Sequence, residues 1–494
     1  MSSPLDFEED YDTRFLLPQG VGDTEDVERY NPGGFHPVHL GDRYDSGRYR
    51  IVHKLGAGGF STVWLARDEK EDKWVALKIV DSEHSNSVGE KSDLSRRVTS
   101  KLLARGAQFV VEHQRQFTFD GPNGHHLCLV LPVLGPSMSE LSYNFTCRPT
   151  PQLARRVAYQ ATKAVADLHS EGLCHGDVTT GNILLSLLDI GQFKEDDIYA
   201  LFGRPTTGSL ETESREATGP EAPRYIVRGI DFLSCSTNII KPNIKLVDFD
   251  QCFSAMSPPE KLLGTPLDFL APEVAVGLAA SPASDAWALG CCIFRLRSGE
   301  GPFSSPFEVT CPADLMRYIV YTLGEDMPLK WQETTLWDSQ GRPTKDPSKG
   351  ELHEQWWEGD QRSLQDMICN IWDEPESRIV QTGTPRPERK ILFEREHQPF
   401  PSCFSKMVWN PRAVKVDNIY LSGYNDEWDA LLEALPKIPK REAALLYDLL
   451  SKIFVYDPTR RPTAEEMLSH PWFHLDGPPD GPPDGPPDGP PDGP

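Results

Sequence analysis

The sequence lacks the patterns that mark disulfide-rich, zinc-binding and membrane-spanning proteins. Ten cysteines occur among 494 residues, but no two of them form a CxxC motif and none cluster with histidine at metal-ligand spacing. We therefore expect neither a disulfide framework nor a zinc site. No apolar run approaches the roughly 18 residues that span a bilayer, and the opening MSSPLDFEED does not resemble a signal peptide. These absences predict a soluble protein of the cytoplasm, the nucleus or both.

Basic residues are also scarce. Lys and Arg number 50 against 74 Asp and Glu, which gives a formal net charge of -24. The residues before Gly47 and after Leu475 carry -13 of this charge, which leaves -11 for the body of the chain. Such a surface repels phosphate groups, so we expect neither direct nucleic-acid binding nor membrane binding. A basic protein partner is favoured instead, and nothing in the sequence demands more than a monomer.

The two ends differ in composition from the middle of the chain. Residues 1–46 are acidic and without regular periodicity; we expect disorder up to Tyr30 and an extended arm over residues 31–42. Residues 476–494 repeat GPPD, which offers no side chains to bury and predicts a disordered tail. The segment between them, residues 47–475, is the expected folded domain.

Within this domain a strand-rich part precedes a helical part, with a boundary near residue 135. Strands are predicted at 48–56, 61–68, 73–81 and 125–135 from β-branched and aromatic runs between turn residues. Apolar residues then recur every three or four positions over 151–172, with Thr150 and Gly172 as caps, which predicts a core helix. We expect lobes at about 47–135 and 136–475. Two irregular stretches, about 186–243 and 324–410, are interpreted as insertions.

The first chemical motif is a glycine-rich stretch between two predicted strands. It reads Leu55-Gly56-Ala57-Gly58-Gly59-Phe60-Ser61-Thr62-Val63. Missing side chains allow backbone N–H groups to approach phosphates, although a plain glycine hairpin has the same pattern. Lys78 follows on the next strand, where a lone lysine is often only a surface charge.

The second motif supplies oxygen ligands. Asp177 and Asn182 lie five residues apart after the predicted core helix, and Asp248 ends an apolar strand. Such a set can hold a hydroxyl group and a magnesium ion side by side. Taken alone, the Asp177 stretch also fits a simple Asx turn.

With these motifs in order, residues 48–475 resemble the eukaryotic protein kinases. Later stretches agree with the resemblance: Ala271-Pro272-Glu273, then Asp285 at the start of DAWALG, then DPTRRP around Arg461. The resemblance implies an α+β fold of two lobes, with an antiparallel sheet in the first and mainly helices in the second. It also implies a charge pair between Glu273 and Arg461.

A narrower resemblance joins the chain to the serine/arginine-protein kinases, particularly their fungal relatives with a short spacer. It rests on NPGGFHPVHLGDRYDSGRYRIVHKLGAGGFSTVWLARD, on CLVLPVLGPSM and on the position of the first insertion. The family implies basic Arg/Ser-rich splicing factors as substrates, which an acidic body attracts. Eight carboxylates against one arginine over residues 351–376 form a candidate docking surface or a solvated acidic loop.

The resemblance also implies roles for individual residues. Asp177 is the expected catalytic base, supported by Lys78 and Asn182, with ATP as phosphate donor. Asn182 and Asp248 are the expected Mg²⁺ ligands, and His175 is expected to brace the loop. The expected nucleotide-binding residues are Leu55, Gly56, Ala57, Gly58, Gly59, Phe60, Ser61, Thr62, Val63, Ala76, Lys78, Leu131 and Leu134.

Three of the residues that depart from the kinase pattern bear on the expected activity. Gly176 replaces an arginine that pairs with a phosphorylated activation loop, which predicts activity without that phosphorylation. Thr179 replaces a lysine that contacts the γ-phosphate, and Asp250 replaces a glycine. The acidic partner of Lys78 is Glu90 or Asp93, and the sequence does not decide between them. A pseudokinase that serves as a scaffold is the alternative function, and a small-molecule phosphotransferase ranks last.

Overall fold

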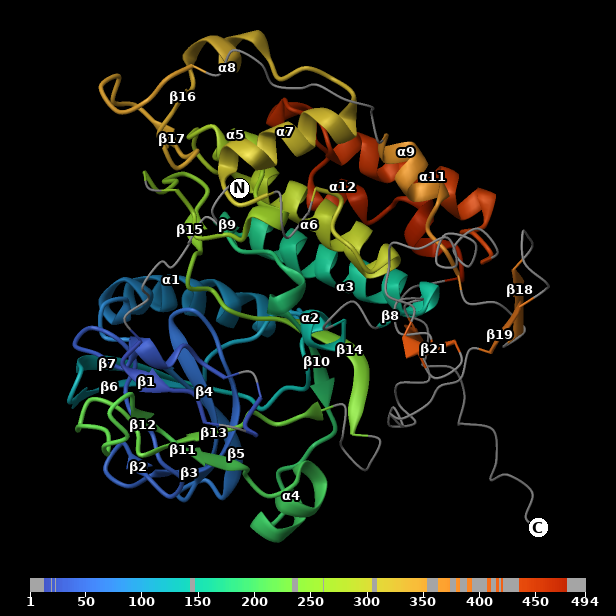
Figure 1. Ribbon diagram of the computed structural model, residues 1–494. Coiled ribbons are helices and arrows are strands. Elements are labelled where there is room, and N and C mark those ends of the chain that lie inside the picture. Colours follow the sequence, from blue (N-terminus) through green and yellow to red (C-terminus); the bar gives the residue numbers. More distant parts are fainter. Residues whose placement is uncertain are drawn as a thin grey trace, which may run out of the picture. The chain divides into compact units, whose positions relative to one another are not determined.

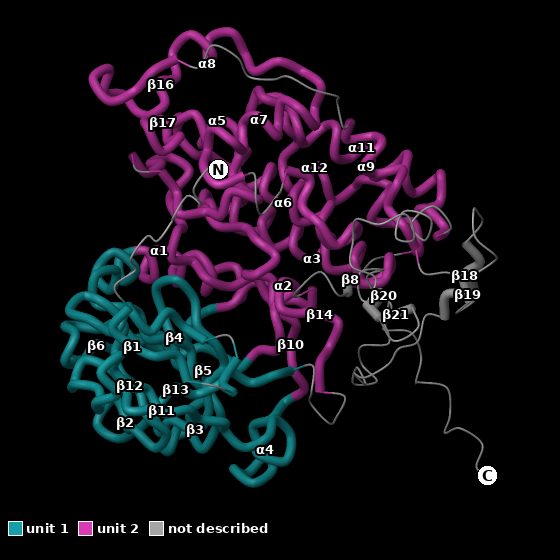
Figure 2. The backbone as a smooth tube through the Cα atoms, viewed as in Figure 1, with its two compact units in different colours: residues 1–90, 112–133, 189–237 teal, residues 91–111, 134–188, 238–494 magenta. Residues whose placement is uncertain are grey.

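The computed structural model divides into two compact units, which Figure 2 colours teal and magenta. Unit 1 comprises residues 1–90, 112–133 and 189–237, and unit 2 comprises residues 91–111, 134–188 and 238–494. The structure describes residues 13–477 except 19, 23, 143–146, 233–238, 261, 304–308, 353–362, 374–378, 383–388, 393–406, 410–414, 417–418 and 421–434. The repeats of the GPPD tail from residue 478 onward therefore lie outside the described residues.

Unit 1 is built on a six-stranded antiparallel sheet in the order β2-β3-β4-β5-β7-β6 (Figure 1). The predicted strands are confirmed, because 48–56, 61–68, 73–81 and 125–135 correspond to β3, β4, β5 and β7. Two strands were not predicted, the short β2 and the strand β6. The bounds are β2 Arg43–Tyr44, β3 Tyr49–Ala57, β4 Ser61–Asp68, β5 Lys73–Val80, β6 Arg115–Gly121 and β7 Gly124–Leu131.

Strand alternation gives the sheet two different faces. On β5, Val75, Leu77 and Ile79 belong to a buried apolar cluster, which Val38 and Val227 complete. Successive side chains of a strand point to opposite faces, so Ala76 and Lys78 lie on the other face. The cluster thus joins the sheet to residues from the arm and from the first insertion.

The N-terminal arm is ordered where the structure describes it, so the expectation of disorder up to Tyr30 is wrong for those residues. Strand β1 (Phe15–Leu16) pairs with β12 (Glu211–Thr212), and a 3₁₀ turn spans Val27–Arg29. A separate apolar cluster unites the arm with the first insertion. Its members are Phe15, Val21, Val27, Tyr30, Phe35, Leu210, Ala222 and Ile226. Burial against distant residues, which local composition does not reveal, orders the arm.

The first insertion is also structured in unit 1. It contains α4 (Glu195–Phe202), β11 (Thr207–Ser209) and β13 (Tyr225–Val227), and the last two strands pair with each other. The indole Nε1 of Trp74 donates to the carbonyl of Phe193 at 2.8 Å. The sheet and the insertion are therefore one packed body.

A buried charge pair joins the sheet to the N-terminal arm. Lys54 on β3 forms an ion pair with Glu25 of the arm, and both side chains are almost fully buried. The Tyr30 hydroxyl donates to the Glu25 carboxylate at 2.6 Å, and burial raises the pKa of Tyr30 well above its usual value. Removing either charge alone would leave the other buried and unpaired, which is strongly unfavourable.

Unit 2 is mainly helical and centres on α3 (Pro151–Ser170) and α6 (Pro282–Ser298). The predicted core helix and its N-cap are confirmed, because the Thr150 hydroxyl accepts from the N–H of Leu153. The predicted C-cap is off by one residue: the C-cap is Glu171, and Gly172 follows it with a φ of 73°. The other α-helices that the structure describes wholly within this unit are α2 Met138–Leu141, α5 Pro272–Ala275, α7 Pro312–Leu323, α8 Leu329–Thr334, α9 Leu364–Cys369, α11 Lys440–Ile453 and α12 Ala464–Met467.

Short strand pairs frame the loops of unit 2. β10 (Ile183–Leu187) pairs with β14 (Ile240–Leu246), and β9 (Leu173–Cys174) pairs with β15 (Phe253–Ser254). Further short pairs are β16 Leu336–Trp337 with β17 Pro343–Thr344, β18 Ile379–Thr382 with β19 Arg389–Leu392, β20 Met407–Trp409 with β8 Cys147–Pro149, and β21 Lys415–Val416 with β22 Ile419–Tyr420.

Helix α1 (Ser85–Ala104) contributes residues to both units. Glu90 and Asp93, the two candidate partners of Lys78, are exposed on it. Its buried positions carry hydroxyl or apolar side chains, namely Ser85, Val88, Ser92, Ser95, Thr99 and Leu102. Throughout the described part of the chain, the helices are too short or too polar to cross a membrane.

Candidate functional site

The glycine hairpin, residues 56–61 where β3 turns into β4, needs its glycines neither for packing nor for backbone conformation. A Cβ atom added at Gly56, Gly58 or Gly59 would meet no atom within 4 Å, and none of the three has a positive φ. The hairpin closes through the N–H of Gly58, which donates to the Ser61 carbonyl at 2.9 Å. Open space beside a bare backbone suits the close approach of a ligand.

Pairing across the sheet places the other predicted residues of unit 1 on one face. Val63 pairs with Lys78, and Lys78 pairs with Leu129, while Ala76 pairs with Leu131. Directly paired residues of antiparallel strands share a face. Lys78 is only 6 % exposed, so it lies in this row rather than projecting as a surface charge.

In unit 2, the loop after α3 brings Asp177 and Asn182 together. The Asn182 amide Nδ2 donates to both the carbonyl and the carboxylate Oδ2 of Asp177, each at 2.9 Å. These bonds engage the amide nitrogen, so the side-chain oxygen Oδ1 is the atom left to act as a ligand. A simple Asx turn does not require this pair of bonds from Asn182 to Asp177.

His175 holds the loop as a neutral imidazole. Its Nδ1 accepts from the N–H of Asp177 at 3.2 Å, and its Nε2 donates to the carbonyl of Val247 at 2.9 Å. Burial lowers the pKa of His175, which keeps the ring neutral, and the two hydrogen bonds set its tautomer. The prediction that His175 braces the loop is confirmed.

Asp248 follows Val247 just beyond the end of β14. The N–H of Val247 donates to the carbonyl of Asn182 at 3.0 Å, and β10 pairs with β14 from Ile183 and Leu246 onward. Asp248 has a φ of 65°, a left-handed conformation that is uncommon for a residue other than glycine. Strained backbone of this kind clusters at functional sites.

Asp285, at the start of α6, holds the backbone of the loop that contains Asp177. Its carboxylate accepts from the N–H of His175 at 2.8 Å and from the N–H of Gly176 at 2.9 Å. Burial would raise the pKa of Asp285, but the hydrogen bond and charge of His169 hold it below its usual value. The sequence offered the DAWALG stretch but no sign of these two bonds.

Gly176 is required by the local backbone. Its φ is 76°, and an added Cβ would lie 2.4 Å from the carbonyl oxygen of Gln251. Any larger residue would therefore strain this conformation and displace Gln251.

Comparison of the chain with known protein families identifies the family to which it belongs. Residues 49–197 and 235–473, more than half of the chain, match the protein kinase domain family. The chain belongs to the protein kinase family. The expected α+β fold, with an antiparallel sheet in one unit and mainly helices in the other, is confirmed.

Curated relatives of this kinase domain include several SR protein kinases. The chain is 34 % identical to protein kinase dsk1 of Schizosaccharomyces pombe over 41 % of its own length and 38 % of that protein. It is 32 % identical to serine/threonine-protein kinase SRPK of Physarum polycephalum over 56 % of its length and 67 % of that protein. Against SKY1 of Saccharomyces cerevisiae the identity is 33 %, over 34 % of the chain and only 24 % of the relative. The resemblance to this group is confirmed, although the chain spans less than two fifths of dsk1 and about a quarter of SKY1.

The charge pair that kinase resemblance implies is present. The two terminal nitrogens of Arg461 each lie 2.7 Å from an oxygen of Glu273, and both side chains are buried. The pair links α5 to the turn before α12. The prediction of this contact is confirmed.

The two remaining departures from the kinase pattern, Thr179 and Asp250, accept hydrogen bonds at their backbone carbonyls. Thr179 is 6 % exposed and precedes the 3₁₀ turn Thr180–Asn182, whose Asn182 N–H donates to the Thr179 carbonyl at 3.1 Å. The carbonyl of Asp250 accepts from the Lys91 ammonium at 2.7 Å. Both residues are therefore held by hydrogen bonds within unit 2.

The predicted site residues fall into two groups. Unit 1 holds the hairpin residues, Ala76, Lys78 and Leu131, and unit 2 holds Leu134, Asp177, Asn182 and Asp248. In unit 1 the structure places Val63, Ala76, Lys78 and Leu131 on one sheet face, and in unit 2 it places Asp177 and Asn182 on one loop beside the strand end that carries Asp248. Their roles in binding and transfer remain predictions.

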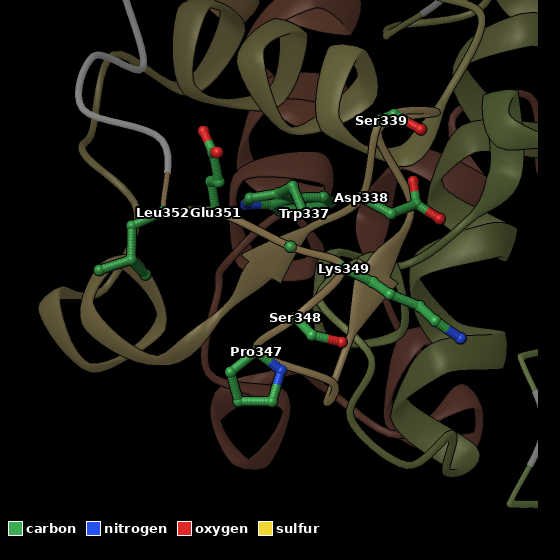
Figure 3. A pocket seen from close by; sticks show the side chains of 9 residues that line it. Trp337, Asp338, Ser339, Pro347, Ser348, Lys349, Glu351 and Leu352 are labelled. Carbon is green, nitrogen blue, oxygen red and sulfur yellow. The ribbon is translucent and has the colours of Figure 1, made fainter.

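A pocket of about 500 Å³ lies in the second insertion of unit 2, at the hairpin of β16 and β17 (Figure 3). Trp337 is hydrogen-bonded through its backbone to Glu351 at 2.9 and 3.0 Å, and Lys349 and Asp338 also line the pocket.

The predicted docking surface at 351–376 falls largely outside the described residues. One of its described carboxylates, Asp373, is paired with Arg297 at 2.9 Å and also with Arg148.

Proposed function

We propose that the chain transfers the γ-phosphate of ATP to serine or threonine of basic, Arg/Ser-rich proteins. The observation that carries the proposal is the loop in which Asn182 donates twice to Asp177 beside the strand end of Asp248. The kinase family supplies the reaction class, since its members transfer phosphate from ATP. Activity, substrate and partners of the whole protein are all part of this proposal.

The oxygen donors of the loop fit a hard divalent cation. Asn182 and Asp248 would hold Mg²⁺, because carboxylate and carbonyl oxygens are the protein ligands that this ion prefers. When bound, Mg²⁺ would neutralise charge on the phosphates. The fit rests on Asn182, whose amide nitrogen is already engaged by Asp177 and whose Oδ1 is thereby oriented.

Asp177 is proposed as the base that accepts the hydrogen bond of the substrate hydroxyl and takes its proton. Its backbone is held by His175 and its carboxylate by Asn182, so its position is set by protein contacts before any substrate binds. Lys78 would pair with the α- and β-phosphates of ATP. Leu131 and Leu134 are proposed to flank adenine, with Val63 and Ala76 above it.

A basic substrate is supported by charge. The chain has a net charge of -24, which attracts an arginine-rich segment and raises its rate of association. The SR protein kinases among the relatives favour the same class. We further propose a monomer of the cytoplasm, the nucleus or both, and activity without loop phosphorylation because Gly176 carries no guanidinium.

The test is transfer of labelled phosphate from Mg-ATP to an Arg/Ser-repeat peptide. A peptide of Arg and Ala is the blank, and a Glu/Ser peptide tests the charge preference. Asp177→Asn should lower the rate roughly a hundred- to ten-thousand-fold. Asp448→Asn is the matched control, because it makes the same chemical change at an exposed position on α11. Phosphatase treatment that abolished wild-type activity would overturn the claim of independence from phosphorylation.

A scaffold function is the second candidate, and the residue Thr179 favours it. A buried threonine replaces the cation expected near the γ-phosphate, whose loss should slow transfer. ATP binding without any label on the Arg/Ser peptide would support the scaffold.

A further inference from the structure

We propose that Arg29 is a positioning residue for nucleotide binding, which holds the tip of the glycine hairpin through Phe60. Arg29 lies outside the region that matches the kinase domain family, which begins at residue 49. The inference rests on the proposed function, because it takes the hairpin as the site of ATP. It assigns the N-terminal arm a role in that site.

The guanidinium group of Arg29 lies against two aromatic rings. Its Cζ is 4.6 Å from the ring centroid of Phe35 and 5.4 Å from that of Phe60. Both distances are within the roughly 6 Å over which a cation is attracted to a ring face. The Phe60 ring also contacts the ring of His84, with centroids 4.4 Å apart. Phe60 is 42 % exposed, so these neighbours, rather than a closed core, hold it.

Asp81 connects the same arginine to the backbone of the hairpin. Its carboxylate is fully buried and forms an ion pair with Arg29. The N–H of Asp81 donates to the carbonyl of Phe60 at 2.9 Å, and the N–H of His84 donates to the Asp81 carboxylate at the same distance. A buried carboxylate keeps its charge only with such partners. Arg29 therefore holds both the ring and, through Asp81, the backbone of residue 60.

The arm is shaped to present Arg29 at this place. The N–H of Phe35 donates to the Arg29 carbonyl at 2.9 Å, and an added Cβ at Gly34 would lie 1.8 Å from that carbonyl oxygen. Only glycine fits such a close approach. The carbonyl of Gly33 accepts from the N–H of Glu83 at 2.8 Å, which fastens the turn to the loop that carries Asp81.

The consequence is a coupling between the arm and nucleotide affinity. A Cβ at Gly58 or Gly59 would meet no atom within 4 Å, so the hairpin backbone is open on the side of these positions. Releasing Phe60 lowers the fraction of molecules whose hairpin is in the binding conformation, and the apparent dissociation constant rises by that factor. Contacts of the cation–π class correspond to about a two- to tenfold change. The transfer step itself does not involve Arg29, so kcat should change less than KM for ATP.

The experiment measures binding of a methylanthraniloyl-ATP probe to the purified full chain. Arg29→Ala should raise the dissociation constant about two- to tenfold, and Arg29→Lys should recover part of the loss by keeping a cation beside Asp81. Arg67→Ala is the matched control, since Arg67 also pairs with a carboxylate, Asp72, and lies 5.0 Å from the ring of Trp74. That control should bind the probe like wild type. An Arg29→Ala value indistinguishable from that of Arg67→Ala would overturn the inference.

Phe60→Leu provides the second variant and keeps the ion pair of Arg29 with Asp81. It should raise the dissociation constant by a similar factor, and the double variant with Arg29→Ala should be less affected than the product of the two factors. If the double variant raises the dissociation constant by the full product of the two single factors, the residues act separately and the proposal is contradicted. A wild-type chain that binds no probe would also contradict it. Probe binding without phosphate transfer would overturn only the proposed kinase activity.

Discussion

Replacing Arg461 by methionine should destabilise unit 2 strongly. The change leaves Glu273 buried without its cation, after the loss of two contacts of 2.7 Å between side chains at most 3 % exposed. Removing one partner of a buried ion pair costs about 3–5 kcal/mol, whereas exposed pairs contribute about 1 kcal/mol or less. Arg461 also donates to the carbonyls of Ala283 and Val455 at 3.0 Å, so the upper part of that range is expected.

Urea denaturation followed by tryptophan fluorescence measures this effect, because the Cζ of Arg461 lies 4.9 Å from the ring of buried Trp287. Arg317→Met is the control, since Arg317 pairs with Asp314 at 3.5 Å and is 46 % exposed. Adding Glu273→Gln to Arg461→Met should restore part of the stability, because it removes the unpaired charge. A loss below about 1 kcal/mol for Arg461→Met would refute the reasoning, as would a double variant less stable than the single one.

Three further predictions concern individual residues. Gly176→Ala should cost about 1–3 kcal/mol and reduce phosphate transfer, because it adds a Cβ at positive φ against Gln251; normal melting temperature and activity would contradict this. Burial, followed by the charge of His126, lowers the pKa of His36 to about 3. As the pH falls below about 6.5, the imidazole of His36 therefore binds a proton in the unfolded chain but not in the folded one, and the folded state loses stability. At pH 4.5 this amounts to roughly 2–3 kcal/mol relative to neutral pH, and His36→Phe should flatten the dependence of urea midpoints on pH; an unchanged slope would count against it. Lys54→Met should destabilise unit 1 by about 3–5 kcal/mol by stranding Glu25, and limited proteolysis should then cut the arm; an arm as resistant as in wild type would disprove this.

Local pattern predicted the regular elements well because the physical causes are local. Strands β4 and β5 contain dense β-branched and aromatic runs, and α3 repeats apolar residues at helical spacing behind a threonine cap. The arm escaped prediction because its order depends on distant partners. Phe15 and Val27 pack with Leu210 and Ile226, about two hundred residues away in sequence, and no local periodicity reports such a contact.

The candidate site divides in the same way. Asp177, Asn182 and Asp248 stand in recognisable motifs, so their residue types alone indicate their chemistry. Asp285 and Arg29 act on the backbone and on an aromatic ring, and these contacts depend on the fold. The positive φ of Gly176 was hidden as well, since the sequence shows only a missing arginine and not the nearby carbonyl of Gln251.

The central claim is that the loop of Asp177 and Asn182 performs phosphate transfer to protein. Its most direct test is the amount of label that an Arg/Ser-repeat peptide receives from Mg-ATP with wild type and with Asp177→Asn. We predict strong labelling that falls at least about a hundredfold in the variant while binding of the ATP probe is retained. Equal labelling by both proteins, or none by a wild type that binds ATP, would contradict the account.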